Sequence, residues 1–197
     1  MEANDGEEHK ALVRAAWAVL ERSGFEGLKV QLVAREAGVS ARTFYRHFAD
    51  KDAMLVALVQ DEMARAGSRL RAAVARTDGP VAQIETWVAG VIGAAADPRR
   101  VARARLFTAL PVVMREHADE ITAGTALLTG PLADAIENGR REGIFPWADV
   151  EGDAALIYGL TGNQLSRALA TPPPHTVDEL IAETTAFALR ALGLPPT

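Results

Sequence analysis

The sequence has no cysteine among its 197 residues, which excludes disulfide bonds, thiolate zinc sites and a cysteine nucleophile. It also lacks a long apolar run, because residues 90–96 are too few to cross a bilayer, which takes roughly 20 residues. The first ten residues are acidic and polar, without the basic start and apolar centre of a secretion signal. From these absences we expect a cytoplasmic protein with no membrane partner.

Enzyme motifs are absent as well. The sequence contains no HExxH, no P-loop, no glycine-rich dinucleotide loop and no G-x-S-x-G elbow, and its four histidines are widely scattered. Residues 116–120 place carboxylates and an imidazole at helical spacing, and a solvated helix turn is favoured there over a metal site. We therefore expect no enzyme, no cofactor and no bound metal. Two classes of protein are kept as alternatives to the function developed below: an enzyme, and a helical interaction protein without DNA affinity.

What is present favours an all-α fold. Hydrophobic residues make up 49% of the chain and charged residues 24%, as in ordinary globular proteins. Glycine and proline divide the chain into helix-length pieces, and apolar residues between them recur with helical spacing. The pattern predicts about nine helices. A three-helix domain over residues 1–50 precedes a connecting helix over 51–76, and a larger helical domain covers 77–197.

Positive charge is concentrated in one short segment of an acidic chain whose net charge is −5. Residues 29–51 hold five basic and two acidic residues, which gives +3, whereas residues 56–197 hold 13 basic and 17 acidic residues, which gives −4. A local basic segment is the electrostatic footprint of nucleic-acid binding. On charge alone, a solvated helical face explains the segment equally well.

The same segment has the layout of two helices joined by a tight turn. Residues 29–37 predict a first helix, Gly38 suits the left-handed residue that ends it, and Ser40 suits the cap of a second helix over residues 41–48. At about 100° per residue, the second helix has an apolar arc and a polar arc. The apolar arc holds Ala41, Phe44, Tyr45 and Phe48, with Tyr45 at its border. The polar arc holds Arg42, Thr43, Arg46 and His47.

Residues 33–52 resemble the helix-turn-helix signature of the tetracycline-repressor (TetR) family, and the resemblance covers roughly residues 10–60. In that family the second helix enters the major groove of DNA. The resemblance implies backbone contacts from Tyr45, His47 and Lys51. It implies contacts to bases or nearby phosphates from Gln31, Ala41, Arg42, Thr43 and Arg46. The full predicted DNA-binding set also includes Ser40 and Lys29.

Two positions depart from the family pattern. The family has a Thr or Ser where the first motif helix begins, and this chain has Leu28 followed by Lys29. The capping hydroxyl is therefore lost, but Lys29 is placed to reach a phosphate. Leu32 stands where many members carry an acidic residue.

The resemblance further implies a homodimer that binds a palindromic double-stranded operator and is released by a small-molecule effector, usually as a repressor. The last two helices, near residues 149–170 and 177–191, carry apolar stripes suited to a four-helix interface, although the same stripes could face the monomer core. For a largely apolar effector the predicted lining residues are Trp87, Phe107, Leu110, Met114, Trp147, Tyr158 and Asn163. Core packing is the alternative for each of them. Asn163 is the most informative, because an amide in an apolar helix needs a partner.

Overall fold

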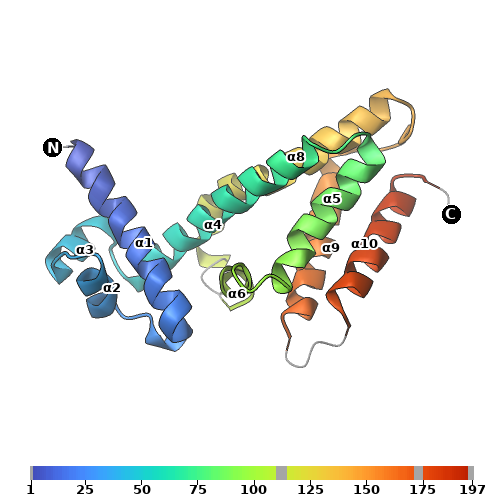
Figure 1. Ribbon diagram of the computed structural model, residues 1–197. Helices are drawn as coiled ribbons and strands as arrows, with labels where there is room; N and C mark the ends of the chain where they lie inside the picture. The colour runs from blue at the N-terminus through green and yellow to red at the C-terminus, as the bar shows by residue number, and fades with distance from the viewer. Residues whose placement is uncertain (1, 110–114, 171–174, 195–197) are drawn as a thin grey trace. The chain divides into compact units, whose positions relative to one another are not determined.

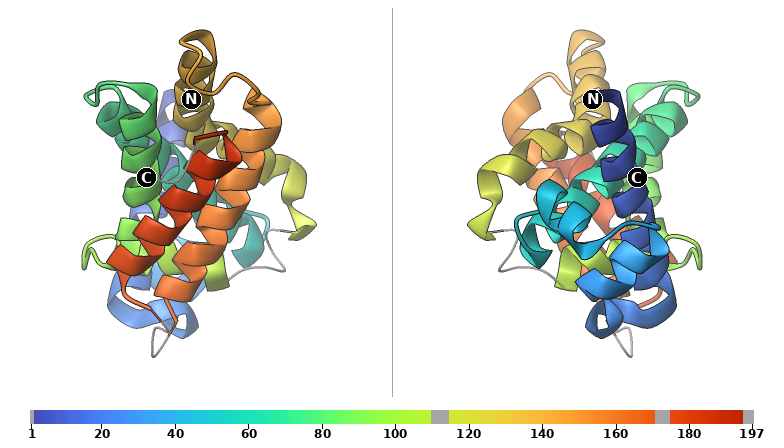
Figure 2. Two further views of the ribbon diagram at one scale, coloured as in Figure 1. Left: turned by 90° about the vertical axis from the view of Figure 1, so that its right-hand side faces the viewer. Right: turned by 90° about the vertical axis from the view of Figure 1, so that its left-hand side faces the viewer.

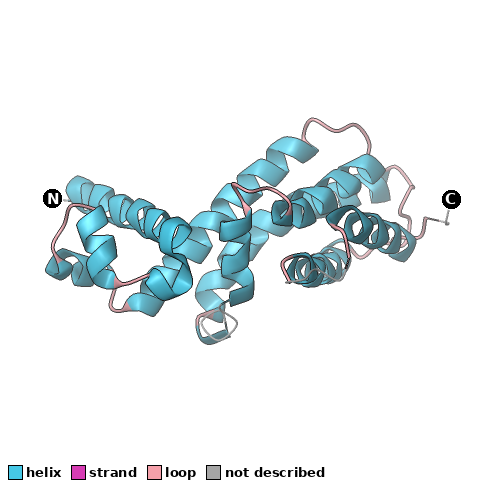
Figure 3. Ribbon diagram, turned by 60° about the horizontal axis from the view of Figure 1, so that its bottom comes forward, coloured by secondary structure: helices cyan, strands magenta, loops and turns pink. Residues whose placement is uncertain are grey.

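The computed structural model describes residues 2–109, 115–170 and 175–194. Over these residues every regular element is helical, with nine α-helices and one short 3-10 helix, as Figure 3 shows by colour. The predicted all-α class is confirmed. No helix within the described ranges combines the length and apolar character required to cross a membrane.

The chain forms two compact units. The first comprises residues 1–62 with 109–121, and the second comprises residues 63–108 with 122–197. The first unit extends past the boundary at residue 50 that the sequence suggested, because the start of the connecting helix packs with it. There the indole N–H of Trp17 donates to the carboxylate of Asp61 over 2.7 Å.

The first unit is built from α1 (Glu2–Gly27), α2 (Val30–Glu36), α3 (Ala41–His47) and the start of α4 (Lys51–Val74). α1 lies beside α2 and α3 (Figure 1) and is interrupted at Gly24, whose φ of 66° is left-handed. A continuous set of buried apolar side chains fills this unit. It includes Leu12, Ala16, Trp17, Val19, Leu20, Val33, Ala34, Phe44, Phe48, Met54 and Leu58.

The second unit holds the rest of α4 and the remaining helices. These are α5 (Pro80–Ile92), η1 (Gly93–Ala95), α6 (Val101–Ala109), most of α8 (Ala118–Arg141), α9 (Val150–Ala168) and α10 (Val177–Ala191). α5, α9 and α10 contact one another, and the left view of Figure 2 shows α9 and α10 side by side at one face of this unit. α4 and α8 cross closely, since a Cβ on Gly67 would lie 2.6 Å from the carbonyl oxygen of Leu127.

The helix ends follow the local signals in the sequence. α4 covers nearly all of the predicted connecting helix, and α9 begins after Asp149, where the sequence placed its start. α10 stops before Gly193, whose φ of 98° is left-handed, as expected for a helix end. At the other end of α10, Thr176 and Glu179 form a capping box that the sequence analysis did not identify.

Candidate nucleic-acid interface

The turn between α2 and α3 has the predicted geometry. Gly38 adopts a φ of 70°, and its N–H donates to the carbonyl of Arg35 over 3.2 Å. The Ser40 hydroxyl accepts from the backbone N–H of Thr43 over 3.0 Å, so it caps α3. Both features were predicted and both are confirmed. Together they fix the direction in which α3 leaves the turn.

α3 presents one apolar and one polar face. Phe44 and Phe48 are buried, and their ring centroids lie 5.4 Å apart. Arg42 and Arg46 are exposed, and 55% of Tyr45 is exposed while its ring packs edge-on against Phe44. The border position predicted for Tyr45 is therefore confirmed.

Ala41 departs from the predicted apolar arc, because it is exposed rather than buried. It stands in the first turn of α3, ahead of the point at which Phe44 enters the core. Because its methyl group is small and exposed, a bound molecule can approach the start of α3 closely there.

His47 also departs from the prediction, which placed it on the exposed arc. Its side chain is only 5% exposed, because the first turns of α1 cover it. Nε2 of His47 lies 3.1 Å from Glu8 and 3.6 Å from Asp5, and its ring lies edge-on to His9. No sequence pattern indicates that the N-terminal segment reaches this helix.

Arg46 contacts the same two carboxylates. It forms an ion pair with Glu8, and its Nε lies 3.6 Å from Asp5. The oxygens of Asp5 and Glu8 and a ring nitrogen of His47 lie within 4.8 Å of one another, a donor set that suits a divalent cation. Because Glu8 is already paired with the Arg46 guanidinium, we assign no metal here. Among the described residues, segment 116–120 forms no group of this kind.

His9 sits in an environment that disfavours its charged form. Burial lowers the pKa of His9, and the neighbouring His47 lowers it further, whereas Asp5 acts in the opposite direction. The ring packs on Phe48 with 4.9 Å between centroids. Neutral His9 therefore fits the folded first unit better than protonated His9.

The stability of the first unit is expected to fall on acidification because of His9. Above about pH 6.5 the group is neutral in both states and has no effect on folding. Below that pH the unfolded chain binds the proton first, so the free energy of unfolding falls until the lowered folded-state pKa is passed. Denaturant unfolding at about pH 7.5 and about pH 5.5 measures this loss. His9→Phe keeps a ring on Phe48 and should show a smaller loss, and an equal loss in both proteins would contradict the assignment.

The remaining predicted positions lie around α3. Lys29 is exposed at the N-cap of α2 and forms no side-chain cap, as the departure from the family pattern predicted. Gln31 is exposed, and the half-buried Lys51 opens α4. The Thr43 hydroxyl lies 3.0 Å from that of Ser40, so these two side chains are partly committed to the turn.

One structural residue near Lys51 was missed by the sequence analysis. Asp50 accepts from the backbone N–H of Ala53 over 2.8 Å and so caps α4. An Asp directly before a helical run was the signal that could have identified it.

The described residues that were predicted to line an effector pocket differ widely in burial. Trp87 is fully buried and donates its indole N–H to the carbonyl of Leu128 over 2.9 Å, whereas Trp147 is 89% exposed. Tyr158 is half-buried and bonds to Thr125, and burial raises the pKa of its hydroxyl. Leu110, Met114 and the side chain of Phe107 lie outside the described residues.

The expected partner of the Asn163 amide, whether backbone, a second subunit or a ligand, stays a prediction. Asn163 is exposed, and it is the neighbouring Gln164 that is buried, where it accepts from Arg167 over 2.8 Å. One residue corresponds to about 100° around a helix, so a small error in phase exchanges the two amides.

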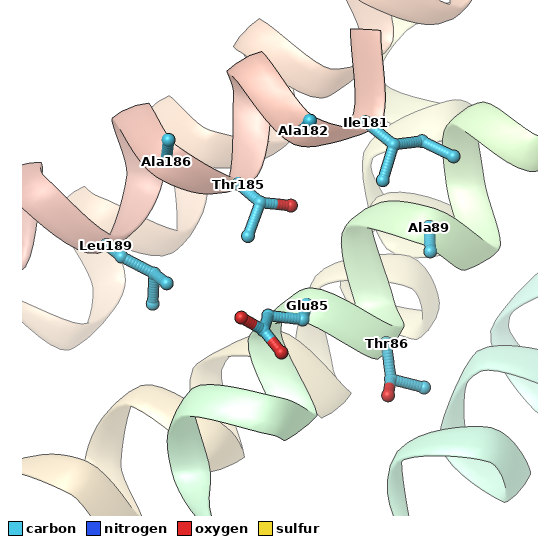
Figure 4. Close-up of a pocket in the computed structure, with 8 residues that line it drawn as sticks. All are labelled: Glu85, Thr86, Ala89, Ile181, Ala182, Thr185, Ala186 and Leu189. Carbon is cyan, nitrogen blue, oxygen red and sulfur yellow. The ribbon is translucent and has the colours of Figure 1, made fainter. Parts of the chain in front are cut away.

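The second unit contains a groove that the sequence analysis did not identify. It lies between α5 and α10 and has a volume of about 520 Å³. Its walls are mainly apolar, with Ala89, Ile181, Ala182, Ala186 and Leu189 among the lining residues. Figure 4 shows Glu85 reaching from α5 toward Thr185 on α10. The buried hydroxyl of Thr185 has no hydrogen-bond partner among the described residues. None of Trp87, Trp147, Tyr158 and Asn163, the predicted pocket residues whose side chains the structure describes, lines this groove.

α9 and α10 also expose apolar side chains. Leu156 is 74% exposed and Phe187 is 54% exposed. Gly159 and Gly162 face open space, since a Cβ added at either would meet nothing within 4 Å. Phe187 belongs to the predicted stripe of the last helix and thus lies on the surface of the single chain, whereas Leu156 was not part of a predicted stripe. Ile157, Leu180 and Ala188 of the predicted stripes pack in the core.

Comparison with known proteins relates the helix-turn-helix to a family and the whole fold to solved structures. Residues 12–58 match the family model described as bacterial regulatory proteins, tetR family. A search of curated proteins gave no significant match. The fold is shared with the fatty acid degradation regulator FadR from Bacillus halodurans, at TM-score 0.72 and 21% identity, over 94% of this chain and 99% of that chain.

Two further structures share the fold. RolR in complex with resorcinol gives a TM-score of 0.75 at 16% identity, over 98% of this chain and 91% of that chain. FadR from Bacillus subtilis in complex with stearoyl-CoA gives 0.68 at 17% identity, over 91% of this chain and 97% of that chain. The match to the tetR family of bacterial regulatory proteins covers the helix-turn-helix, and it lies within a fold that these solved structures share along nearly the whole chain.

Proposed function

We propose that the chain is a transcriptional repressor that binds a palindromic DNA operator through the polar face of α3 and leaves it when an effector binds. One observation carries the DNA-binding part. Arg42 and Arg46 project from α3 on the side opposite the buried Phe44 and Phe48, and the exposed Tyr45 lies at the border of the two faces. A short helix held in this way can enter the major groove while its apolar face remains in the protein.

Each residue around α3 has a role that fits its position. Arg42, which stands exposed in the first turn, is suited to the hydrogen-bond acceptors of a guanine edge or to a phosphate. The hydroxyl of Tyr45 and the ammonium groups of Lys29 and Lys51 are suited to phosphates on either side. Ala41, Thr43 and Gln31 complete the face, and Ser40 holds the turn in place.

Selection of bound sequences from random DNA tests this function directly. A homodimer places two recognition helices one helical turn apart, so the selected DNA should hold two inverted half-sites whose centres are about 34 Å apart. Retention of such DNA should fall steeply with salt, because each phosphate contact releases counterions. Failure to enrich any sequence, together with salt-independent retention, would contradict the proposal.

The dimer that this operator requires is proposed to form through α9 and α10. The support is the exposed apolar surface of Leu156 and Phe187 and the open space at Gly159 and Gly162. Burying apolar side chains against a second copy removes them from water, and small residues allow the helices to approach.

Charge introduced on this surface should separate the protomers. The double variant Leu156→Glu with Phe187→Glu is expected to sediment as a folded monomer where the wild type sediments as a dimer, because two carboxylates would be buried without partners. Trp147→Glu, which alters an exposed aromatic residue outside α9 and α10, should remain dimeric. A dimeric double variant would place the interface elsewhere.

The effector is proposed to bind in the groove between α5 and α10. Its apolar walls suit an apolar body, the Glu85 carboxylate suits a cationic group, and the free Thr185 hydroxyl suits a hydrogen-bonding atom. Resorcinol and stearoyl-CoA are bound by proteins of the same fold, which supports a ligand-responsive regulator but gives no ligand for this one. In this proposal the effector binds more tightly to a form of the dimer in which the two recognition helices are wrongly spaced for the operator, so its binding releases DNA. The motion is transmitted through α4.

Simple alkyl probes test the groove. Hexylamine is expected to raise the melting temperature of the wild type more than hexanol or hexanoate does, because only the amine carries a charge that complements Glu85. Glu85→Gln should remove this preference, while Glu151→Gln, an exposed carboxylate on α9, should keep it. Equal responses to all three probes would show that Glu85 does not select the ligand.

A further inference from the structure

The polar face of α3 is not uniformly available to DNA. Arg46, in its last turn, forms an ion pair with Glu8 and approaches Asp5 to 3.6 Å, while Arg42, in its first turn, has no ion pair among the described residues. Both acids belong to the first turns of α1, nearly 40 positions earlier in the chain. The same carboxylates enclose the ring of His47.

A charge count shows what this contact does to the face. Two carboxylates oppose one guanidinium, so Asp5, Glu8 and Arg46 together carry a net charge of about −1 at the C-terminal end of α3. A DNA phosphate is also an anion and seeks the same donors of the guanidinium. A phosphate and the two carboxylates therefore compete for Arg46.

We propose that Asp5 and Glu8 are specificity-determining residues, which compete with DNA phosphates for Arg46 and so weaken binding to non-specific DNA more than binding to the operator. The inference rests on the proposed function, because it requires α3 to face DNA. It assigns to the acidic N-terminal turns of α1 a role in choosing among DNA sequences.

The two kinds of DNA differ in what they offer once the acids are displaced. Non-specific binding depends almost entirely on phosphate contacts, so a cation that is already paired contributes little. An operator adds hydrogen bonds to base edges, which compensate for breaking the ion pair. The cost of displacing Glu8 and Asp5 thus falls on every sequence, but only the correct sequence offsets it.

The chain offers a matched control for this idea. Glu7 is next to Glu8 on α1 and is exposed, but it pairs with Lys10 over 3.0 Å and forms no hydrogen bond or ion pair with α3 among the described residues. Glu7→Gln and Glu8→Gln change the net charge by the same amount at nearly the same place. Any difference between these variants reports on the contact with Arg46 rather than on total charge.

The experiment measures the affinity of wild type, Glu7→Gln, Glu8→Gln and the double variant Asp5→Asn with Glu8→Gln for the selected operator and for a scrambled duplex, over a range of salt. For the scrambled duplex, Glu8→Gln should bind about two- to fivefold more tightly than the charge-matched Glu7→Gln control, as expected for exposed ion pairs, and the double variant should bind more tightly still. The dependence of the double variant's affinity on salt concentration should steepen by the amount expected for about one additional phosphate contact. Operator affinity should rise less, so the ratio of the two affinities should fall.

Three outcomes separate the possibilities. Equal effects of Glu7→Gln and Glu8→Gln would overturn the competition, because only net charge would then matter. Weaker binding of Glu8→Gln to both duplexes, with an unchanged melting temperature, would also overturn it, since Glu8 would then hold Arg46 in place for DNA. If the wild type itself binds neither duplex, it is the proposed function that fails.

Discussion

Replacing Trp87 with alanine is expected to lower the free energy of unfolding by about 3–5 kcal/mol. Trp87 is the largest of the fully buried side chains of the second unit, and its indole N–H donates to the carbonyl of Leu128 on α8. Truncation would leave a cavity between α5 and α8 and a buried carbonyl without its donor. Denaturant unfolding followed by circular dichroism measures the loss.

A second substitution separates the ring of Trp87 from its hydrogen bond. Trp87→Phe retains most of the apolar volume and loses only the N–H, so it should cost clearly less than Trp87→Ala. If Trp87 instead lined an effector site, alanine would change ligand affinity and leave the stability of the ligand-free protein nearly unaltered. A loss below about 1 kcal/mol for Trp87→Ala would therefore contradict the core role assigned here.

Replacing Arg42 with alanine is expected to weaken operator binding by about 1–3 kcal/mol, which is roughly 5- to 150-fold. Arg42 is exposed on α3 and has no ion pair among the described residues, so its guanidinium can meet DNA without displacing a partner. Fluorescence anisotropy with a labelled operator measures the change. Because the side chain is exposed, the melting temperature should stay close to that of the wild type.

The salt dependence identifies what Arg42 contacts. Loss of a phosphate contact would reduce the salt slope by about one and weaken binding to all sequences, whereas loss of a base contact would relax the preference at one position. Arg76→Ala removes an exposed arginine beyond the end of α4 and should leave affinity nearly unchanged. Equal losses of operator affinity for Arg42→Ala and Arg76→Ala would show that the effect arises from net charge alone.

The parts of the site that the sequence predicted are those set by local interactions. Gly38 needs a left-handed φ, and Ser40 caps the helix three residues before Thr43, so short segments of sequence determine both. The burial of Phe44 and Phe48 follows from helical periodicity in the same way.

The parts that the sequence did not predict depend on contacts between distant residues. Nothing near His47 indicates that Glu8 and Asp5 will cover it, because the contact closes a loop of nearly 40 residues. Trp87 and Trp147 look equally suited to a pocket in the sequence, yet one is fully buried and the other is almost entirely in solvent. The exchange of Asn163 and Gln164 shows that helical phase has to be known to within one residue before a polar side chain can be assigned.

The central claim is that the polar face of α3 is the DNA-binding surface. Titrating isotope-labelled protein with the selected operator and following the backbone amide resonances tests it most directly. We expect the largest changes over residues 38–48, with smaller changes at Lys29 and Lys51 and little change along α5. Changes concentrated on α5 or α8, with the amides of α3 unaffected, would contradict the claim.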